Sequence, residues 1–302
     1  MENVLTIDLE EWYHANYEDN LFQPGQDYEE RVIGNTNKML DLFDRYQAKA
    51  TFFTLGMIAE KYPELVRLIH KRGHEIASHG YGHQLIYNQS EQEFEEDLQK
   101  SIITIEKAIG QRPKGFRAPS WSVKHETPWV FSVLKRNGIE YDASIFPVKT
   151  FLYGIPDAPR MPFQMNFREG SMLEFPTSTV QLGSKNVPFS GGFYFRFLPY
   201  AVIRRMFRVL NKAGQPVIFY LHPREIDPHQ PKLEKLSFRD HFIHYYQIGS
   251  CERKLEKLLR EFRFTTVENY LFHSQKEFDV VWSLNESAVY RPAGAGGRTI
   301  SG

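Results

Sequence analysis

Short apolar runs alternate along the chain with longer segments whose apolar residues recur every three or four positions. The short runs are typical of buried strands and the longer segments of amphipathic helices. The predicted strands are residues 3–8, 49–56, 74–78, 115–119, 139–144, 216–222 and 263–267. The predicted helices are residues 27–47, 57–73, 90–110, 127–138, 199–212, 251–262 and 267–273. Strict alternation as far as residue 145 predicts parallel βαβ units.

Punctuating residues support several of these boundaries. Ser90 is a capping residue before an acidic first turn, and Gly110 marks the end of the same helix. Pro63 is expected to open a second helical piece inside residues 57–73, and Gly73 to stop it.

The second half of the chain is less regular. Residues 146–195 are rich in Pro and Gly and predict long loops with short strands such as "SMLEF". We find no repeat and no clear linker, so we expect a single domain over residues 1–290, with a disordered tail at 291–302. The expected fold class is α/β, a closed or nearly closed barrel of parallel strands whose site lies at the carboxyl ends of those strands.

Composition and charge narrow the class of protein. Lys and Arg together number 37, as do Asp and Glu, so the chain has no electrostatic footprint for nucleic acid or an anionic membrane. The single cysteine, Cys251, cannot form an intramolecular disulfide. The first residues show no signal-peptide pattern, and no apolar run has the length of a membrane span. These features predict a soluble cytoplasmic protein.

Polar side chains gather where the predicted parallel strands end. Such strand ends converge on one face of an α/β fold, so we expect these residues to share a site. They are Asp8, Glu10, His79, His83, Arg117 and His222.

The stretch "SHGYGH" holds His79 and His83 four positions apart. Gly80 and Gly82 make a regular helix costly here, but a tight turn could direct both imidazoles at one ion. Two such ligands suit zinc, iron, cobalt or nickel once a carboxylate completes the set. The alternative is two polar residues near a buried strand. His74, before that strand, is expected to be structural.

Carboxylates at the end of the first strand could complete the site. Asp8 and Glu10 share one side of the strand because side chains alternate, so one could bind a metal and the other act as a base. Glu11 should point elsewhere. Helix capping is the alternative role for either acid.

Two later motifs could add to the same chemistry. Arg117 could hold a buried carboxylate in its ionised form, or could be a surface arginine. After Pro119, the Ser120 N–H is available to a site. His222 is either a core residue or a general acid or base.

Aromatic residues make up 15% of the chain, enough for sugar-stacking walls, with an aromatic-rich core as the alternative. The candidates for stacking are Trp12, Tyr13, Trp121, Phe193 and Tyr194.

Taken together, "TIDLEE", "SHGYGH", "FRAPSW" and "YLHP" resemble the polysaccharide deacetylase family, the NodB homology domain. Later segments, among them "YDASIFP", "GGFYFRFLPY" and "ERKLEKLLREFRFTTV", resemble the C-terminal extension of the branch found beside exosortase and exopolysaccharide loci. The resemblance implies a distorted barrel of about seven parallel strands. It places the core at residues 1–225 and the extension at 226–290.

The resemblance also implies roles. Asp8 would be the catalytic base, oriented by Arg117, and His222 the general acid. The Ser120 N–H would stabilise the oxyanion. A divalent metal, usually zinc, with cobalt, nickel, iron or manganese as alternatives, would be held by Glu10, His79 and His83.

This chain departs from the family pattern at two points. Glu10 stands where the family usually has an aspartate one residue earlier, and Glu11 is the competing ligand. No Asp-Trp pair is evident to tune His222, so Asp142 and Glu174 are the candidates for that carboxylate.

The implied activity is removal of N-acetyl groups from a glycan or glycan precursor in exopolysaccharide or cell-wall biosynthesis. The implied location is the cytoplasm, with attachment to the inner face of the membrane left open. Two alternatives stay open: an allantoinase-like hydrolase of cyclic ureides without a metal, and an inactive carbohydrate-binding protein.

Overall fold

A computed structural model of the protein describes residues 1–16, 28–150, 153–233, 236–274, 280–283 and 286–290. Seven parallel strands lie side by side in its main sheet, as the sequence predicts. In spatial order they are β10 (Ile218–Leu221), β1 (Glu2–Leu9), β2 (Thr51–Thr54), β3 (Glu75–Ser78), β4 (Gly115–Phe116), β5 (Tyr141–Asp142) and β7 (Gly170–Glu174).

The backbone groups on the outer edge of β10 form hydrogen bonds with loop residues and not with another strand. The Ser178 N–H donates to the Ile218 carbonyl at 3.3 Å, and the Ile218 N–H donates to the Ser178 hydroxyl at 2.8 Å. Further along, the Tyr220 N–H donates to the Ser190 carbonyl at 2.9 Å. These bonds cover polar groups that an open sheet edge would expose. The sheet is therefore a distorted, nearly closed barrel.

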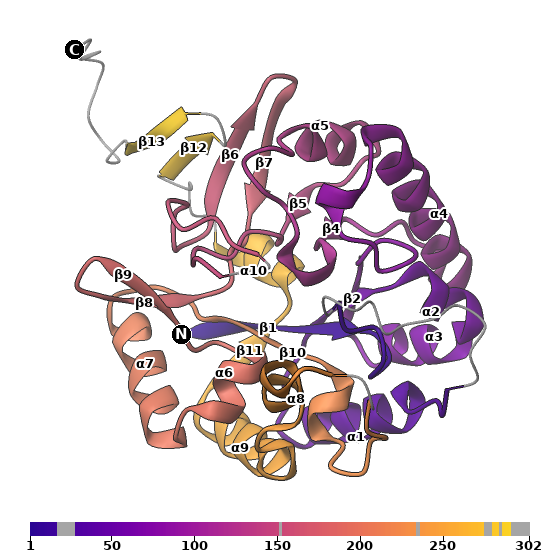
Figure 1. Ribbon diagram of the computed structural model, residues 1–302, viewed down its shortest axis with the longest axis vertical. Coiled ribbons are helices and arrows are strands. Elements are labelled where there is room, and N and C mark those ends of the chain that lie inside the picture. Colours follow the sequence, from indigo (N-terminus) through magenta and orange to yellow (C-terminus); the bar gives the residue numbers. More distant parts are fainter. Residues whose placement is uncertain (17–27, 151–152, 234–235, 275–279, 284–285, 291–302) are drawn as a thin grey trace.

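Helices surround this sheet (Figure 1). They are α1 (Val32–Arg45), α2 (Gly56–Lys61), α3 (Pro63–Lys71), α4 (Glu91–Ile109), α5 (Trp129–Arg136), α6 (Gly192–Phe197), α7 (Tyr200–Lys212), α8 (Phe238–Tyr245), α9 (Ile248–Glu261) and α10 (Val267–Ser274). Ser90 and Glu93 form a capping box at the start of α4, and Gly110 ends it in the left-handed region with φ 76°. The predicted break at Pro63 is confirmed, since that residue opens α3. Among the described residues, no helix is long and apolar enough to cross a membrane.

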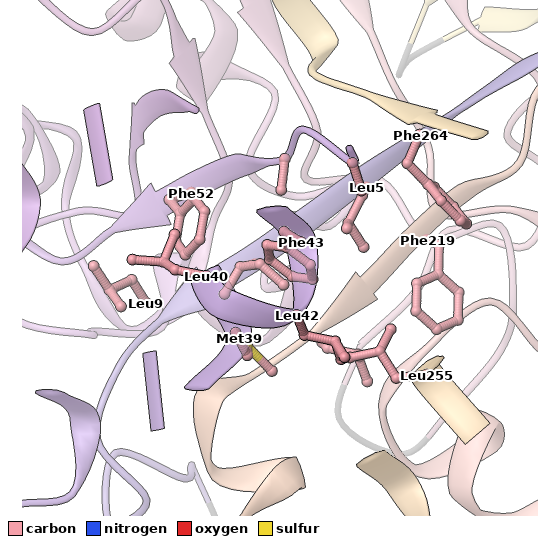
Figure 2. Packing of buried hydrophobic residues seen from close by; sticks show 14 of the residues in the cluster. Leu5, Leu9, Met39, Leu40, Leu42, Phe43, Phe52, Phe219, Leu255 and Phe264 are labelled. Carbon is pink, nitrogen blue, oxygen red and sulfur yellow. The ribbon is translucent and has the colours of Figure 1, made fainter. Parts of the chain in front are cut away.

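The main core lies between α1 and the strands of the barrel (Figure 2). Met39, Leu40 and Phe43 of α1 are fully buried and pack in one cluster with Leu5 of β1 and Phe52 of β2. Full burial of each large side chain stabilises the fold by about 1.5–3 kcal/mol. This packing fixes β1, whose carboxyl end carries Asp8 and Glu10, against the barrel wall.

The structure differs from the sequence expectations mainly after residue 145. Much of the predicted loop region forms two antiparallel pairs: β6 (Phe163–Phe167) with β7, and β8 (Thr179–Leu182) with β9 (Lys185–Pro188). The β8–β9 pair is only partly buried and lacks an apolar alternation, so its sequence resembles loop. The predicted strand at 263–267 is confirmed as β11 (Arg263–Thr265), which pairs with β1, whereas β12 (Val280–Ser283) and its partner β13 (Glu286–Tyr290) were not predicted. The predicted disordered tail, 291–302, lies outside the described residues.

The predicted start of the first helix was too early. Residues 28–31 are not helical, and α1 begins at Val32. The beginning of that prediction, residue 27, lies outside the described residues.

Candidate active site

A cavity of about 300 Å³ opens at the carboxyl ends of the central strands. Six residues that the sequence singled out line it or contact its walls: Asp8, Glu10, His79, His83, Arg117 and His222. The parallel topology brings them together although they are spread over more than 200 positions, as the strand-end argument predicts.

Asp8 is held by a buried ion pair. The Arg117 guanidinium donates from Nη1 to Asp8 Oδ1 at 2.7 Å and to the Thr6 hydroxyl at 2.9 Å. Its Nε donates to the Ala143 carbonyl at 3.1 Å. The second carboxylate oxygen of Asp8 faces His222 Nε2 at 3.7 Å. Arg117 thus fixes one oxygen of Asp8 and leaves the other toward the cavity.

Glu10, His79 and His83 form the candidate metal centre. One ligand atom from each lies within 4.8 Å of the other two, and Glu10 Oε2 is 2.7 Å from His83 Nε2. Within the described part of the chain, no other group of three such residues converges in this way. His79 Nδ1 is 2.7 Å from the Arg117 carbonyl, which leaves Nε2 as a lone-pair donor toward the other two ligands. This donor set fits a divalent ion with open coordination positions.

Electrostatics also favour a cation between these residues. Burial alone would raise the pKa of Glu10, but the nearby His83 and His222 hold it well below its usual range. Burial lowers the pKa of His79 to about 4, so its imidazole is neutral at pH 7. A carboxylate and a neutral imidazole are the forms in which these side chains bind metals.

The glycine-rich turn is held by a residue that the sequence analysis did not single out. Asp97 of α4 accepts hydrogen bonds from the N–H groups of Tyr81 and Gly82 at 2.6 and 3.0 Å. A Cβ at Gly80, where φ is 75°, would lie 2.8 Å from an Asp97 oxygen. His83 itself has φ 56°, a strained conformation for a non-glycine residue. The turn therefore needs glycine at position 80, and Asp97 helps hold it.

Ser120 lies where the sequence places it, in the cavity wall after Pro119. Ser120 and Trp121 are consecutive non-glycine residues in the left-handed region, with φ 51° and 49°. Such strain costs of order 1–3 kcal/mol per residue and is concentrated at functional sites. Within the described residues, the Ser120 N–H has no recorded hydrogen-bond acceptor. It can therefore donate to a group bound in the cavity.

The carboxylate partner of His222 is Glu225, which the sequence analysis missed. Glu225 Oε2 is 3.4 Å from His222 Nδ1, and Glu225 also accepts from the His222 N–H at 3.1 Å. Pro223 starts the short 3-10 helix Pro223–Ile226 that turns Glu225 back onto the histidine. Buried Arg196 of α6 donates to Glu225 Oε1 at 3.1 Å. The sequence did offer a signal for this contact: Glu225 lies three residues after the strand-end histidine His222, and Pro223 between them favours a turn.

This arrangement changes the protonation of both partners. Burial would lower the pKa of His222, but the carboxylates of Glu10, Glu225 and Asp8 outweigh it and raise that pKa. Burial would raise the pKa of Glu225, but His222 and Arg196 lower it to about 2. Glu225 is therefore a carboxylate that favours protonated His222.

The two acids proposed from the sequence for this role were wrong. Asp142 and Glu174 are buried beside one another and hydrogen-bonded together, and burial raises the pKa of both. Asp142 accepts from the Ser144 hydroxyl at 2.7 Å, and Ser144 in turn accepts from the Ala118 N–H at 2.8 Å. The pair thus supports the turn after Arg117 and has no recorded contact with His222.

Three of the five aromatic candidates, Trp121, Phe193 and Tyr194, line the cavity, together with Tyr153 and Tyr220. Trp12 and Tyr13 do not. The chain turns after Glu10, so that the Trp12 indole donates to the Glu29 carbonyl at 2.8 Å and Tyr13 stacks on Tyr28.

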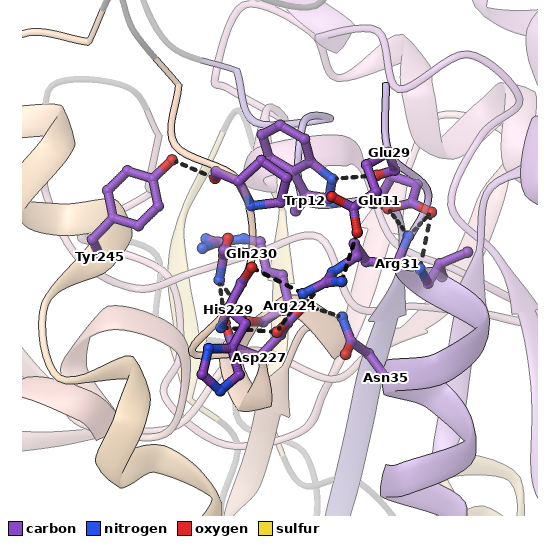
Figure 3. Close-up of polar contacts among 12 residues, drawn as sticks. Glu11, Trp12, Glu29, Arg31, Asn35, Arg224, Asp227, His229, Gln230 and Tyr245 are labelled. Carbon is purple, nitrogen blue, oxygen red and sulfur yellow. Dashed lines mark hydrogen bonds and ion pairs between the residues drawn. The ribbon is translucent and has the colours of Figure 1, made fainter. Parts of the chain in front are cut away.

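Glu11 points away from the metal centre, as expected. Its carboxylate accepts from the N–H groups of Arg31 and Val32, both at 2.9 Å, where α1 begins (Figure 3). Arg31 in turn donates to Asp227 at 2.9 Å and ties this loop to the chain after His222. Glu11 is therefore a helix-start acceptor.

The positions of the two glutamates give a paired prediction. Glu11→Gln should lower the free energy of unfolding by about 1 kcal/mol and leave metal stoichiometry unchanged, because it weakens only bonds at a helix start. Glu10→Gln should lose bound metal in metal analysis and leave the free energy of unfolding in urea nearly unchanged. Loss of metal in Glu11→Gln would mean that the ligand assignment is wrong.

A second prediction concerns Glu225. Glu225→Gln should reduce kcat about tenfold, by analogy with losses on removing supporting groups of a ligand or base. Because Glu225 raises the pKa of His222, its loss should move the alkaline limb of the pH–rate profile to lower pH. Glu252→Gln is the matched control, because Glu252 of α9 is exposed and pairs with Lys38 outside the cavity. A Glu225→Gln profile with an unshifted alkaline limb would contradict this role.

Comparison with known proteins agrees with this site. Residues 27–141 match the polysaccharide deacetylase family, and residues 143–272 match a domain of unknown function (DUF3473). Residues 27–141 are therefore similar to a polysaccharide deacetylase domain. His79, His83 and Arg117 lie in the first region, whereas Arg196, His222 and Glu225 lie in the second. Both matched regions supply walls of one cavity.

Two curated relatives are peptidoglycan deacetylases. The chain is 32% identical to "Peptidoglycan deacetylase" of Helicobacter pylori over 108 residues, 36% of each chain. It is 37% identical to "Peptidoglycan-N-acetylglucosamine deacetylase" of Bacillus cereus over 84 residues, 28% of this chain and 30% of the relative. The match thus spans about a third of each relative's length.

Solved structures confirm the α/β fold. A probable polysaccharide deacetylase from Pseudomonas aeruginosa PAO1 superposes with a TM-score of 0.58 at 16% identity, covering 91% of this chain and 92% of that one. PuuE allantoinase gives the same TM-score and identity, covering 90% of this chain and 91% of that one. These two likenesses therefore show the fold alone.

Proposed function

We propose that the protein is a metal-dependent hydrolase that removes N-acetyl groups from N-acetylhexosamine residues of a glycan or glycan precursor. One observation carries this proposal. The convergent set of Glu10, His79 and His83 lies in the same cavity as a buried Asp8–Arg117 pair and a His222–Glu225 pair. The names of the curated relatives support the reaction type.

The residues of the chain divide the reaction between them. A divalent ion held by Glu10, His79 and His83 would supply Lewis-acid polarisation of the acetamide carbonyl and a more acidic water. Asp8, oriented by its ion pair with Arg117, takes a proton from the attacking water. The Ser120 N–H donates to the developing oxyanion. His222 gives its proton to the leaving nitrogen as the C–N bond breaks. Acetate and a free amino sugar are the products.

Asp8 and His222 suit opposite proton transfers. Asp8 Oδ2 and His222 Nε2 lie 3.7 Å apart and both line the cavity, so a base and an acid can reach the same bound group. Glu225 supports protonated His222, and Arg117 orients Asp8. This division between acid and base is what amide hydrolysis requires.

We assign zinc as the metal, because two imidazoles and one carboxylate with an open position are a donor set common to catalytic zinc. The proposed acceptor belongs to exopolysaccharide or cell-wall biosynthesis, and the proposed location is the cytoplasm or the inner membrane face. We also propose that residues 1–290 act as one domain, since both halves contribute to the cavity.

The allantoinase-like alternative is favoured only by the shared fold, and the convergent metal ligands count against a metal-free enzyme. An inactive carbohydrate binder has no use for the buried Asp8–Arg117 and His222–Glu225 pairs. The test is acetate release from an N-acetylglucosamine oligosaccharide, measured beside ring opening of allantoin. Acetate release alone is expected; ring opening without acetate release would overturn the proposal.

A further inference from the structure

An aromatic patch lies beside the cavity. We define it as Phe193 and Phe197 of α6, Phe238 and Phe242 of α8, and Tyr246. Phe197, Phe238 and Phe242 are 49%, 90% and 38% exposed, and they are the only strongly exposed phenylalanines among the described residues. Large apolar side chains gathered on a surface in this way mark an interaction site.

The patch is continuous with the cavity. Phe193 lines the cavity, and its ring lies 5.4 Å from Phe197 and 5.9 Å from Phe242, measured between ring centroids. Phe242 packs on Tyr246 at 4.6 Å. Phe238 lies one turn before Phe242 on α8, on the same face of the helix. An apolar surface therefore leads from the cavity wall outward.

The cavity is also lined by two cations that form no ion pair among the described residues. Arg117 and Arg196 are each committed to a buried carboxylate. Arg224 and Lys149 also line the cavity, but within the described residues neither forms an ion pair. The recorded hydrogen bond of the Arg224 side chain is a long one, 3.4 Å to the His244 carbonyl. These two cations are available to an anionic group on the substrate.

We propose that the substrate is an N-acetylhexosamine joined through a phosphate or diphosphate to a long-chain lipid. Arg224 and Lys149 would take the phosphate, and the aromatic patch would take the first part of the apolar chain. This inference rests on the proposed deacetylase function and narrows its substrate class.

The composition of the patch favours a lipid chain over a glycan. Sugar sites combine rings with side chains that bind the hydroxyl groups, because an unsatisfied hydroxyl is costly to bury. Four of the five patch residues are phenylalanine, which has no hydrogen-bonding group. A lipid chain needs no such partners and gains from every methylene that leaves water.

The test is calorimetric binding of two ligands to the full chain with its metal. One ligand is N-acetylglucosamine 1-phosphate, and the other is its decyl ester below the micelle concentration. The wild type should bind the ester at least about tenfold more tightly, given the transfer of several methylene groups from water. Arg224→Gln should weaken the binding of both ligands about tenfold, which is the loss expected when one charge-assisted hydrogen bond is removed.

Variants of the patch separate the two contributions. Phe238→Ser and Phe242→Ser should abolish the gain from the decyl chain while binding of the tailless phosphate stays unchanged. Leu182→Ser is the matched control, because Leu182 is 74% exposed and lies in β8, outside the patch. It should keep the full gain.

Three outcomes would overturn the proposal: no gain from the chain in the wild type, an undiminished gain in Phe238→Ser and Phe242→Ser, or no weakening in Arg224→Gln. A fourth is binding to phosphatidylglycerol vesicles that depends on Phe238 while the decyl ester shows no gain, since the patch would then be a membrane-docking surface. The readout is binding, so it does not depend on acetate release. Tight binding without acetate release would refute the deacetylase function instead.

Discussion

Asp8→Asn is expected to lower kcat by about 10³-fold, within the range attributed to a positioned general base. The substitution preserves shape, and the amide oxygen of asparagine can still accept the Arg117 hydrogen bond that Asp8 accepts at 2.7 Å. What it removes is the basic oxygen that faces the cavity. Metal content and the circular dichroism spectrum should stay at wild-type values, while the rate of acetate release falls.

Asp157→Asn is the matched control, since Asp157 is exposed and pairs with His125 outside the cavity. It should have wild-type kcat. If Asp8→Asn deacetylates at a rate close to the wild type, another group removes the proton and the assignment of Asp8 as base is wrong.

Arg196→Met should destabilise the fold by about 3–5 kcal/mol, the usual cost of leaving a buried charge without its partner. Arg196 and Glu225 are both fully buried, and their ion pair spans 3.1 Å. Arg196 also donates to the carbonyls of Tyr246 and Ile243, so it joins α6 to α8. Urea unfolding measures the loss.

The double variant Arg196→Met with Glu225→Gln separates charge from position. Neutralising Glu225 should restore part of the stability, because no uncompensated carboxylate remains. It should not restore kcat, since His222 still lacks its carboxylate. A double variant no more stable than Arg196→Met would show that the loss comes from the missing carbonyl contacts instead.

The sequence predicts well those features that depend on strand ends. Asp8, Glu10, His79, His83 and Arg117 converge because each follows or ends a parallel strand, and that rule needs no knowledge of side-chain packing. Ser90 and Gly110 bound α4 because capping is a local property of the backbone. The expectation of about seven parallel strands, which the resemblance to a known family implies, is confirmed as well.

Features set by packing between distant segments could not be predicted in this way. Asp97 reaches the glycine turn across the α4–barrel interface, and in the sequence it is one of several acids in an amphipathic helix. Arg196 meets Glu225 because α6 packs beside the turn after β10, a contact that no periodicity reveals. Asp142 and Glu174 were proposed as the carboxylate partner of His222, but they pair with one another instead.

The central claim is tested most directly by acetate release from an N-acetylglucosamine oligosaccharide before and after removal of metal. Dialysis against a chelator should abolish activity, and stoichiometric Zn²⁺ or Co²⁺ should restore it in the wild type. In His79→Ala, where one of the three metal ligands is missing, adding the same metal should restore little acetate release. Undiminished acetate release from metal-free protein, or full recovery in His79→Ala, would contradict the account.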